Sequence, residues 1–122
     1  MTPPPFRMQN SVIRDPKGRV KFKRLSADGA DHYHIGVWIE SDDPELMDRV
    51  SHVEYTLHPS FPNRERRSEN RRNDFSITFW AWGRFDVEAR VFVEGEAEPF
   101  RITHRLNIQL PADTGANYVD VT

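Results

Sequence analysis

The feature that most constrains the fold is a regular alternation of side chains in several short stretches of the chain. In residues 33–39, 53–57, 75–79, 87–93 and 102–110, every second residue is apolar or aromatic with few exceptions. Successive side chains of a β-strand point to opposite faces, so a period of two predicts strands that bury one face. No stretch shows the 3.6-residue period of an amphipathic helix. Short strands separated by turn residues are typical of an all-β sandwich or barrel.

Proline, glycine and aspartate mark the turns between these strands. The Asp-Pro-Lys-Gly segment at residues 15–18 favours a turn and predicts a hairpin in which residues 11–14 pair with residues 19–25. Residues 42–46, Asp-Asp-Pro-Glu-Leu, predict one helical turn. Aspartate accepts hydrogen bonds from the free amides of a helix start, and proline suits the first helical position.

The domain organisation follows from length and from the two ends of the chain. A length of 122 residues suits one domain with one core. Consecutive prolines near the N-terminus predict an extended lead-in over residues 1–10. We expect the β-sandwich to occupy residues 11–110, and residues 111–122 to form a loose tail or a linker.

Charge and composition exclude several kinds of partner and site. Seventeen basic and 19 acidic residues give a formal net charge of −2, so no global field attracts nucleic acid or an anionic membrane. The absence of cysteine excludes disulfides and thiolate metal sites, and it favours a reducing compartment, the cytoplasm. We also expect no export signal and no membrane anchor, because no apolar run is long enough to span a bilayer.

Three motifs follow one another in a recognisable order. They are Val-Trp-Ile at residues 37–39, Val-Glu-Tyr-Thr-Leu-His-Pro-Ser-Phe-Pro at 53–62, and Ala-Trp-Gly-Arg-Phe at 81–85, with Phe75 before the last. This order resembles the YEATS domain, and specifically its prokaryotic branch, over most of the chain. The resemblance implies an immunoglobulin-like β-sandwich of two antiparallel sheets.

The same resemblance implies a ligand site formed by two loops. In eukaryotic YEATS domains, a His, a Ser and a Phe of one loop and an aromatic residue of another form a slot that binds acylated lysine. The positions that match these motifs here are His58, Ser60, Phe61, Ala81, Trp82 and Gly83. Ala81 stands where the family usually has glycine, and the loop before Tyr33 has no clear counterpart of the third aromatic that some members use.

The chemistry of such a slot suits a planar, uncharged amide. An acyl-lysine amide between two aromatic faces gains dispersion and apolar burial that a hydrated ammonium would resist. We therefore expect Phe61 and Trp82 to form the walls. The amide carbonyl and N–H need partners once water is expelled, and the Ser60 hydroxyl and backbone groups of residues 81–83 are the candidates. His58 would shape and orient the slot.

Simpler interpretations exist for the same residues. His58 and Ser60 suggest a nucleophile, but the sequence identifies neither the carboxylate nor the oxyanion donors of a triad, so we do not expect a hydrolase. Phe61 and Trp82 are alternatively ordinary core aromatics, a common position for large apolar side chains.

The arginine-rich residues 63–73 also have two interpretations. Acidic residues are interleaved with the arginines, which favours a solvated loop. Otherwise the loop docks a phosphate or an acidic partner, with Arg64, Arg66 and Arg67 as possible accessory residues of the ligand site.

Three histidines and one tryptophan complete the candidates. His32 and His34 share a strand face, but no third ligand of the right type is spaced nearby, so we expect no metal site. His104 lies on the apolar face of the last strand, which favours a hydrogen-bonded core or rim position. Trp38 points away from the core face of its strand, and either covers the second face of the sheet or contacts a partner.

The sequence therefore predicts a non-catalytic binding module without a cofactor or a metal. Its expected ligand is an acylated lysine of a peptide or protein, or a small planar molecule. Prokaryotic YEATS domains are similar to modules beside signalling or conflict-system effectors, which implies a fused or neighbouring effector domain as a further partner. The alternative is a structural or regulatory protein-interaction domain whose slot is closed or vestigial.

Overall fold

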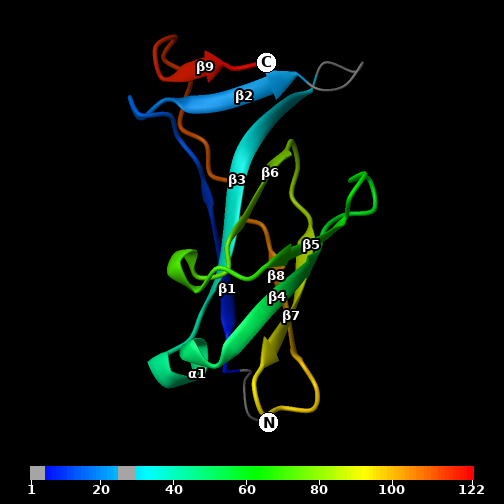
Figure 1. Ribbon diagram of the computed structural model, residues 1–122. Helices are drawn as coiled ribbons and strands as arrows, with labels where there is room; N and C mark the ends of the chain where they lie inside the picture. Colours follow the sequence, from blue (N-terminus) through cyan, green and yellow to red (C-terminus); the bar gives the residue numbers. More distant parts are fainter. Residues whose placement is uncertain (1–4, 25–29) are drawn as a thin grey trace.

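A computed structural model describes residues 5–24 and 30–122, which form two β-sheets around one core (Figure 1). The strands are β1 (Arg7–Val12), β2 (Val20–Arg24), β3 (Asp31–Glu40), β4 (Val50–Thr56), β5 (Glu65–Ser68), β6 (Ile77–Ala81), β7 (Asp86–Val93), β8 (Phe100–Arg105) and β9 (Tyr118–Asp120), with one short helix, α1 (Pro44–Asp48), and a 3-10 turn, η1 (Arg71–Asn73). The first sheet has the order β1-β3-β2-β9, with β6 also paired to β3, and the second has the order β5-β4-β7-β8. The expected all-β, immunoglobulin-like sandwich is confirmed.

Strand β3 organises the first sheet. Its second half pairs with β1, its first half pairs with β2, and β6 runs along its other side. These pairs are antiparallel, whereas β2 and β9 are parallel, so the first sheet is mixed. The alternation predicted for β3 is confirmed, because Ile35, Val37 and Ile39 are fully buried while Trp38 on the other face is half-buried.

The core lies between the inner faces of the two sheets. In the second sheet the same alternation buries Val53 and Tyr55 of β4, and Leu57 just beyond it. Burial of apolar surface is the main stabilising contribution here, at roughly 25 cal/mol for each Å² removed from water. The largest fully buried side chains are Tyr55, Phe75, Ile35, Ile39, Leu57, Leu106, Val20, Val37, Val53, Val87 and Val91.

A hydrogen bond from the core fixes the entry to β6. Asp74 and Phe75, which precede the strand, both have a left-handed backbone with φ of 58°. That conformation is unfavourable for residues other than glycine. The Tyr55 hydroxyl donates to the Phe75 carbonyl at 2.6 Å, and the Phe75 amide donates to the Asn70 carbonyl at 2.9 Å. These bonds hold the left-handed segment and so set where β6 begins.

The predicted hairpin at the N-terminal end is wrong, although its turn is present. The Gly18 amide donates to the Asp15 carbonyl, and Gly18 has a φ of 78°. Strand β1 nevertheless pairs with β3. The contacts across the turn include an isolated bridge between Arg14 and Val20 and a hydrogen bond from the Asp15 amide to the Arg19 carbonyl at 2.9 Å. The residues of a turn determine only the local backbone. Which strand pairs with β1 depends on how many residues can pair, and β1 pairs with β3 along its whole length. Leu25, the last residue of the predicted second strand, lies outside the described residues.

The helical turn is confirmed, and the prediction of a solvated arginine-rich loop is wrong in part. The Asp43 carboxylate caps α1 by accepting from the amides of Glu45 at 3.0 Å and Leu46 at 3.3 Å. Within residues 63–73, β5 pairs with β4, and the Arg90 guanidinium donates to the Glu65 carboxylate at 2.8 Å. Strand formation here depends on pairing with β4, which charge content does not reveal.

Paired strands reach beyond both ends of the expected sandwich. Strand β1 begins at Arg7 with Phe6 already buried, whereas residues 1–4 of the expected lead-in lie outside the described residues. Strand β8 ends at Arg105 rather than at Leu110, which is exposed. Beyond it, β9 pairs with β2, so the segment expected to be loose contributes a strand. No helix in the described residues is long and apolar enough to cross a membrane.

Candidate functional site

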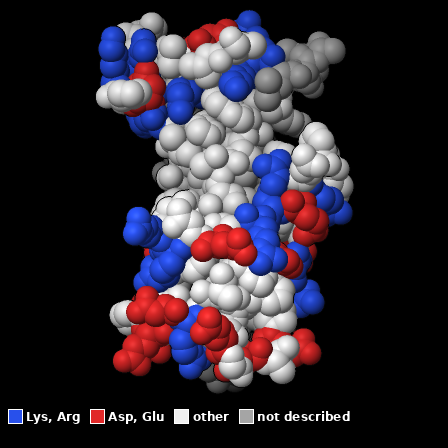
Figure 2. Space-filling view, viewed as in Figure 1, with Lys and Arg blue, Asp and Glu red and all other residues white. Residues whose placement is uncertain are grey.

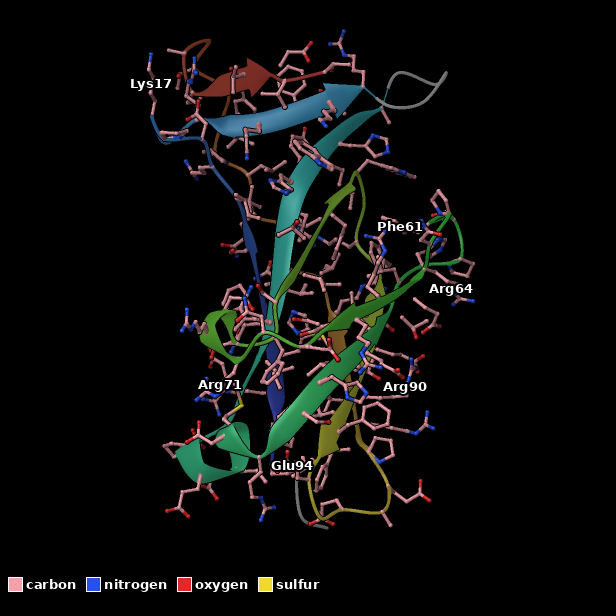
Figure 3. The ribbon with its side chains drawn as sticks, viewed as in Figure 1. Lys17, Phe61, Arg64, Arg71, Arg90 and Glu94 are labelled. Carbon is pink, nitrogen blue, oxygen red and sulfur yellow. The ribbon has the colours of Figure 1, made fainter. Side chains whose placement is uncertain are left out.

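The loop between β4 and β5 is tied at its base. The Leu57 amide donates to the Arg64 carbonyl at 2.7 Å, and Arg64 Nε donates to the Leu57 carbonyl at 3.3 Å. Inside the loop, the Phe61 amide donates to the His58 carbonyl at 3.0 Å. Because Leu57 is buried, the base of the loop is anchored in the core. Figure 3 shows Phe61 and Arg64 on this loop between β4 and β5.

His58 and Ser60 form a hydrogen-bonded pair whose proton positions follow from the geometry. The Ser60 amide donates to His58 Nδ1 at 3.1 Å, so Nδ1 is an acceptor without a proton. Ser60 Oγ lies 2.9 Å from the same nitrogen and therefore donates to it. The lone pairs of Ser60 Oγ remain as acceptors for a ligand N–H. In the described part of the chain no carboxylate is bonded to His58, so the pair lacks the third member of a triad.

Phe61 packs on two aromatic rings that come from the other side of the cavity. Its ring meets Phe79 of β6 edge-to-face, with centroids 5.6 Å apart and an interplanar angle of 84°. Its centroid lies 5.4 Å from that of Phe85, which is itself 5.9 Å from Phe79. Phe79 and Phe85 are buried, whereas Phe61 is half-buried. Phe61 is thus fixed by core aromatics while part of its surface stays accessible.

The second loop, residues 82–85, carries the chain from β6 in the first sheet to β7 in the second. Ala81 is buried at the end of β6, whereas Trp82 is 66% exposed. A Cβ at Gly83 would meet no atom within 4 Å, so nothing packs against this face of the loop. Trp82 therefore projects from the loop with most of its side chain exposed, whereas Phe85 at the end of the loop is buried.

Both loops line one cavity of about 800 Å³. The structure brings all six predicted ligand-site residues to it, together with one of the possible accessory arginines and with residues that the sequence interpretation did not assign to the site. The predicted residues are His58, Ser60, Phe61, Ala81, Trp82 and Gly83, the accessory one is Arg66, and the additional ones are His32, Pro62, Thr78, Phe79, Trp80, Arg84 and Phe85. No aspartate or glutamate is among them.

Of the three possible accessory arginines, only Arg66 lines this cavity. It pairs with Tyr55 across β4 and β5, so its side chain leaves the edge strand on the core side. Arg64 lines a smaller neighbouring cavity of about 420 Å³, and Arg67 is paired with Glu69 at 2.6 Å. The alternation of apolar residues does not reveal that a charged side chain at a sheet edge points inward. The sequence therefore could not show which of the three arginines lies at the cavity.

His34 lies against an aromatic ring of the neighbouring strand β6. His34 stacks on Trp80 with centroids 4.6 Å apart and an angle of 8°, and Lys23 Nζ lies 4.4 Å from the Trp80 ring. Burial, and then the charges of Lys21 and Lys23, lower the pKa of His34 below its ordinary value. Among the described residues no group of three or more potential metal ligands occurs.

His104 and Trp38 have structural partners. The Asn10 amide oxygen accepts from the Asn107 backbone amide at 3.0 Å, so it also accepts from His104 Nε2 at 2.7 Å. Burial lowers the pKa of His104. The rim position expected for this histidine is thereby supported. Trp38 Nε1 donates to the Glu40 carboxylate at 3.1 Å.

The chain matches the family model of the prokaryotic YEATS domain over residues 33–107. It belongs to the prokaryotic YEATS family. The matched range begins within β3 and ends just beyond β8, so it includes both loops of the cavity in this YEATS domain. A comparison with curated proteins finds no match.

Solved YEATS domains have the same fold. The Yaf9 YEATS domain bound to H3K27ac superposes with a TM-score of 0.57 at 20% identity, covering 89% of this chain and 73% of that one. The Yaf9 YEATS domain recognising an H3K122suc peptide gives 0.56 at 18%, covering 84% and 70%. The yeast AF-9 homolog protein Yaf9 gives 0.57 at 20%, covering 85% and 69%. At this identity the likeness supports the fold alone.

Proposed function

We propose that this prokaryotic YEATS domain is a non-catalytic module that binds an acylated lysine side chain, or a similar planar amide, in the cavity lined by Phe61 and Trp82. One observation carries the proposal. Phe61 is held against Phe79 and Phe85 yet keeps accessible surface, and the largely exposed Trp82 lines the same cavity. An acyl group between these rings would bury apolar surface that water now covers.

The polar groups of the cavity suit the two ends of an amide. The Ser60 oxygen, with its proton directed at His58, is available as an acceptor for the amide N–H. In the described residues, the backbone amides of Trp82 and Gly83 have no backbone acceptor and are candidate donors to the acyl carbonyl. An amide bound in this way would lose little hydrogen bonding when water is expelled.

The charges of the cavity disfavour an unmodified lysine. Arg66 and Arg84 are among its lining residues, and no carboxylate is. An ammonium would lose its hydration, meet no counter-ion and lie near two guanidinium groups. A neutral acyl-lysine avoids these costs, and an acyl chain that ends in a carboxylate would gain from the arginines.

The ligands of the similar structures support the class of ligand. The Yaf9 domains carry H3K27ac in one structure and recognise an H3K122suc peptide in another, and both are acylated lysines of a peptide. By this analogy the ligand of the present domain is an acylated lysine within a peptide or protein. We further propose that the domain acts in the cytoplasm and delivers a fused or neighbouring effector domain to that ligand.

Calorimetric titration with a panel of acyl-lysine peptides tests the proposal, with the unmodified peptide alongside. We expect Phe61→Ala and Trp82→Ala each to weaken binding about ten-fold or more, because each removes one aromatic wall. The matched control is Phe92→Ala, since Phe92 stacks on His52 on the outer face of the second sheet, 4.2 Å between centroids, and does not line the cavity. Thermal unfolding checks that each variant folds. A wild-type protein that ignores the whole panel would overturn the proposal.

A further inference from the structure

Strand β6 is an unprotected edge of the first sheet. In the described residues it pairs with β3 on one side and with no strand on the other (Figure 1). Its sequence, Ile-Thr-Phe-Trp-Ala, contains neither a charged residue nor a proline. By contrast, the edge strand β5 reads Glu-Arg-Arg-Ser. Natural proteins usually place charges or prolines on edge strands because unpaired backbone groups are a template for another strand.

The backbone groups that face outward on β6 follow from the hydrogen bonds of β3. The Ile13 amide donates to the His34 carbonyl at 2.8 Å, so the backbone groups of His34 point toward β1 and away from β6. Trp80 is the β6 residue opposite His34. In an antiparallel pair, opposite residues either exchange both bonds or none, so the N–H and C=O of Trp80 point away from β3. The direction of the backbone groups reverses at each residue of a strand, so the N–H and C=O of Thr78, two residues from Trp80, also point away from β3.

These outward groups lie along the candidate ligand cavity. Thr78 and Trp80 both line it, while Phe61, Pro62 and Arg66 contribute from the second sheet. Figure 2 shows an uncharged band across the part of the surface where β3 and β6 lie in Figure 1. The cavity therefore combines a place for one side chain with two outward backbone N–H groups and two carbonyls that are unpaired within the described residues.

We propose that the ligand binds as an added strand: an extended peptide pairs with Thr78 and Trp80 along the free edge of β6 and directs its acylated lysine toward Phe61 and Trp82. This inference rests on the proposed function and adds to it that the ligand is a peptide backbone as well as a modified side chain. Main-chain pairing gives affinity that depends little on sequence, while the cavity selects the side chain between the strands.

A peptide fits the observations better than a second copy of this chain. Two β6 edges paired with each other would bring neutral strands together but would supply no flexible amide side chain to the cavity, since β6 contains no lysine, asparagine or glutamine. The lining arginines, Arg66 and Arg84, also favour a partner whose nearby residues are acidic or uncharged.

The test compares a capped acetyl-lysine monomer with a short serine and alanine peptide that carries one central acetyl-lysine. We expect the peptide to bind about ten-fold tighter, because its backbone adds hydrogen bonds to Thr78 and Trp80 that the monomer lacks. N-methylation of the peptide at successive residues removes one amide proton at a time. Loss of affinity should alternate with a period of two residues, and its phase gives the direction of the strand.

Two further measurements locate the pairing. Amide hydrogen exchange should slow at Thr78 and Trp80 when the peptide binds and should not slow with the monomer, whereas Phe79, already bonded to β3, is the internal control. Thr78→Pro removes an outward N–H while keeping the bonds to β3, as proline at an edge permits. It should bring the ratio of peptide to monomer affinity to about one. Thr78→Ser, which keeps the amide, should leave that ratio high.

The outcomes separate the two proposals. If monomer and peptide bind equally, with no alternation and no new protection at Thr78 and Trp80, strand addition is wrong and acyl-lysine binding stands. If neither binds, both proposals fall. If Thr78 and Trp80 become protected with rising protein concentration in the absence of ligand, a second copy occupies the edge and the inference is overturned.

Discussion

The hydrogen bond from Tyr55 to the segment before β6 gives the sharpest test of the fold. Tyr55 is fully buried, and its hydroxyl donates to the Phe75 carbonyl at 2.6 Å. Tyr55→Phe keeps the ring and removes only this donor. Water does not reach the hydroxyl, because the side chain is fully buried, and the same burial raises the pKa of Tyr55. Losing a buried hydrogen bond and leaving its acceptor unpaired costs about 1–3 kcal/mol. We expect a loss of about 2 kcal/mol in the free energy of unfolding. The lost bond also supports the left-handed backbone of Asp74 and Phe75, a conformation that costs about 1–2 kcal/mol per residue.

Denaturant unfolding of wild type and variant measures this difference directly, and thermal unfolding should show a midpoint lower by about 8 °C for a domain of this size. The matched control is Tyr118→Phe. The Tyr118 hydroxyl donates to the Pro111 carbonyl at the same 2.6 Å, but Tyr118 is only half-buried, so water can replace the lost donor. We expect about 0.5 kcal/mol there. Equal losses in the two variants would refute the claim that the Tyr55 bond supports a strained segment.

Two further predictions concern a histidine and two glycines. The pKa of His104 is lowered by burial, so the folded state favours the neutral ring that donates to Asn10, and stability should fall as the pH drops below about 6.5. His104→Gln should reduce the fall of the denaturation midpoint between about pH 7.5 and 5.5, and the part that remains is expected from His34, whose pKa is lowered as well. Gly83→Ala should leave the unfolding midpoint within about 2 °C of wild type, because a Cβ there meets nothing and its φ is not left-handed. Gly36→Ala should lower it more, since that Cβ would lie 3.3 Å from Ile13 Cδ1, and equal midpoints would contradict this.

The alternation of side chains predicted which residues enter the core, because facing is a local property of a strand. Ile35, Val37 and Ile39 are buried as expected, and so are Val53 and Tyr55. Partner choice is a long-range property, and there the predictions failed. The turn at residues 15–18 formed, but β1 found a longer register with β3 than the turn offered with β2.

For the candidate site, the sequence predicted residues of the two loops but not the residues of the sheets that pack against them. Motif resemblance identified Phe61 and Trp82, and the structure brings both to one cavity. Phe79 was expected only as a core residue, yet it packs against Phe61 from the opposite sheet. Arg66 was one of several equivalent arginines until its pairing with Tyr55 fixed the direction of its side chain. Both roles depend on contacts between sheets, which no local pattern contains.

The position of the cavity predicts that the proposed binding is coupled to the packing of the two sheets. Phe61 belongs to a loop of the second sheet, whereas Phe79 belongs to β6 of the first, and Phe85 lies on the chain that joins the two. The contact between Phe61 and Phe79 therefore holds the free edge of β6 beside the loop that faces it. A ligand bound as proposed would lie against the same aromatic rings that join the sheets. We therefore expect the width of the cavity to depend on Phe79 and Phe85 as well as on the two loops, so that substitutions in the core would change the specificity of the proposed site.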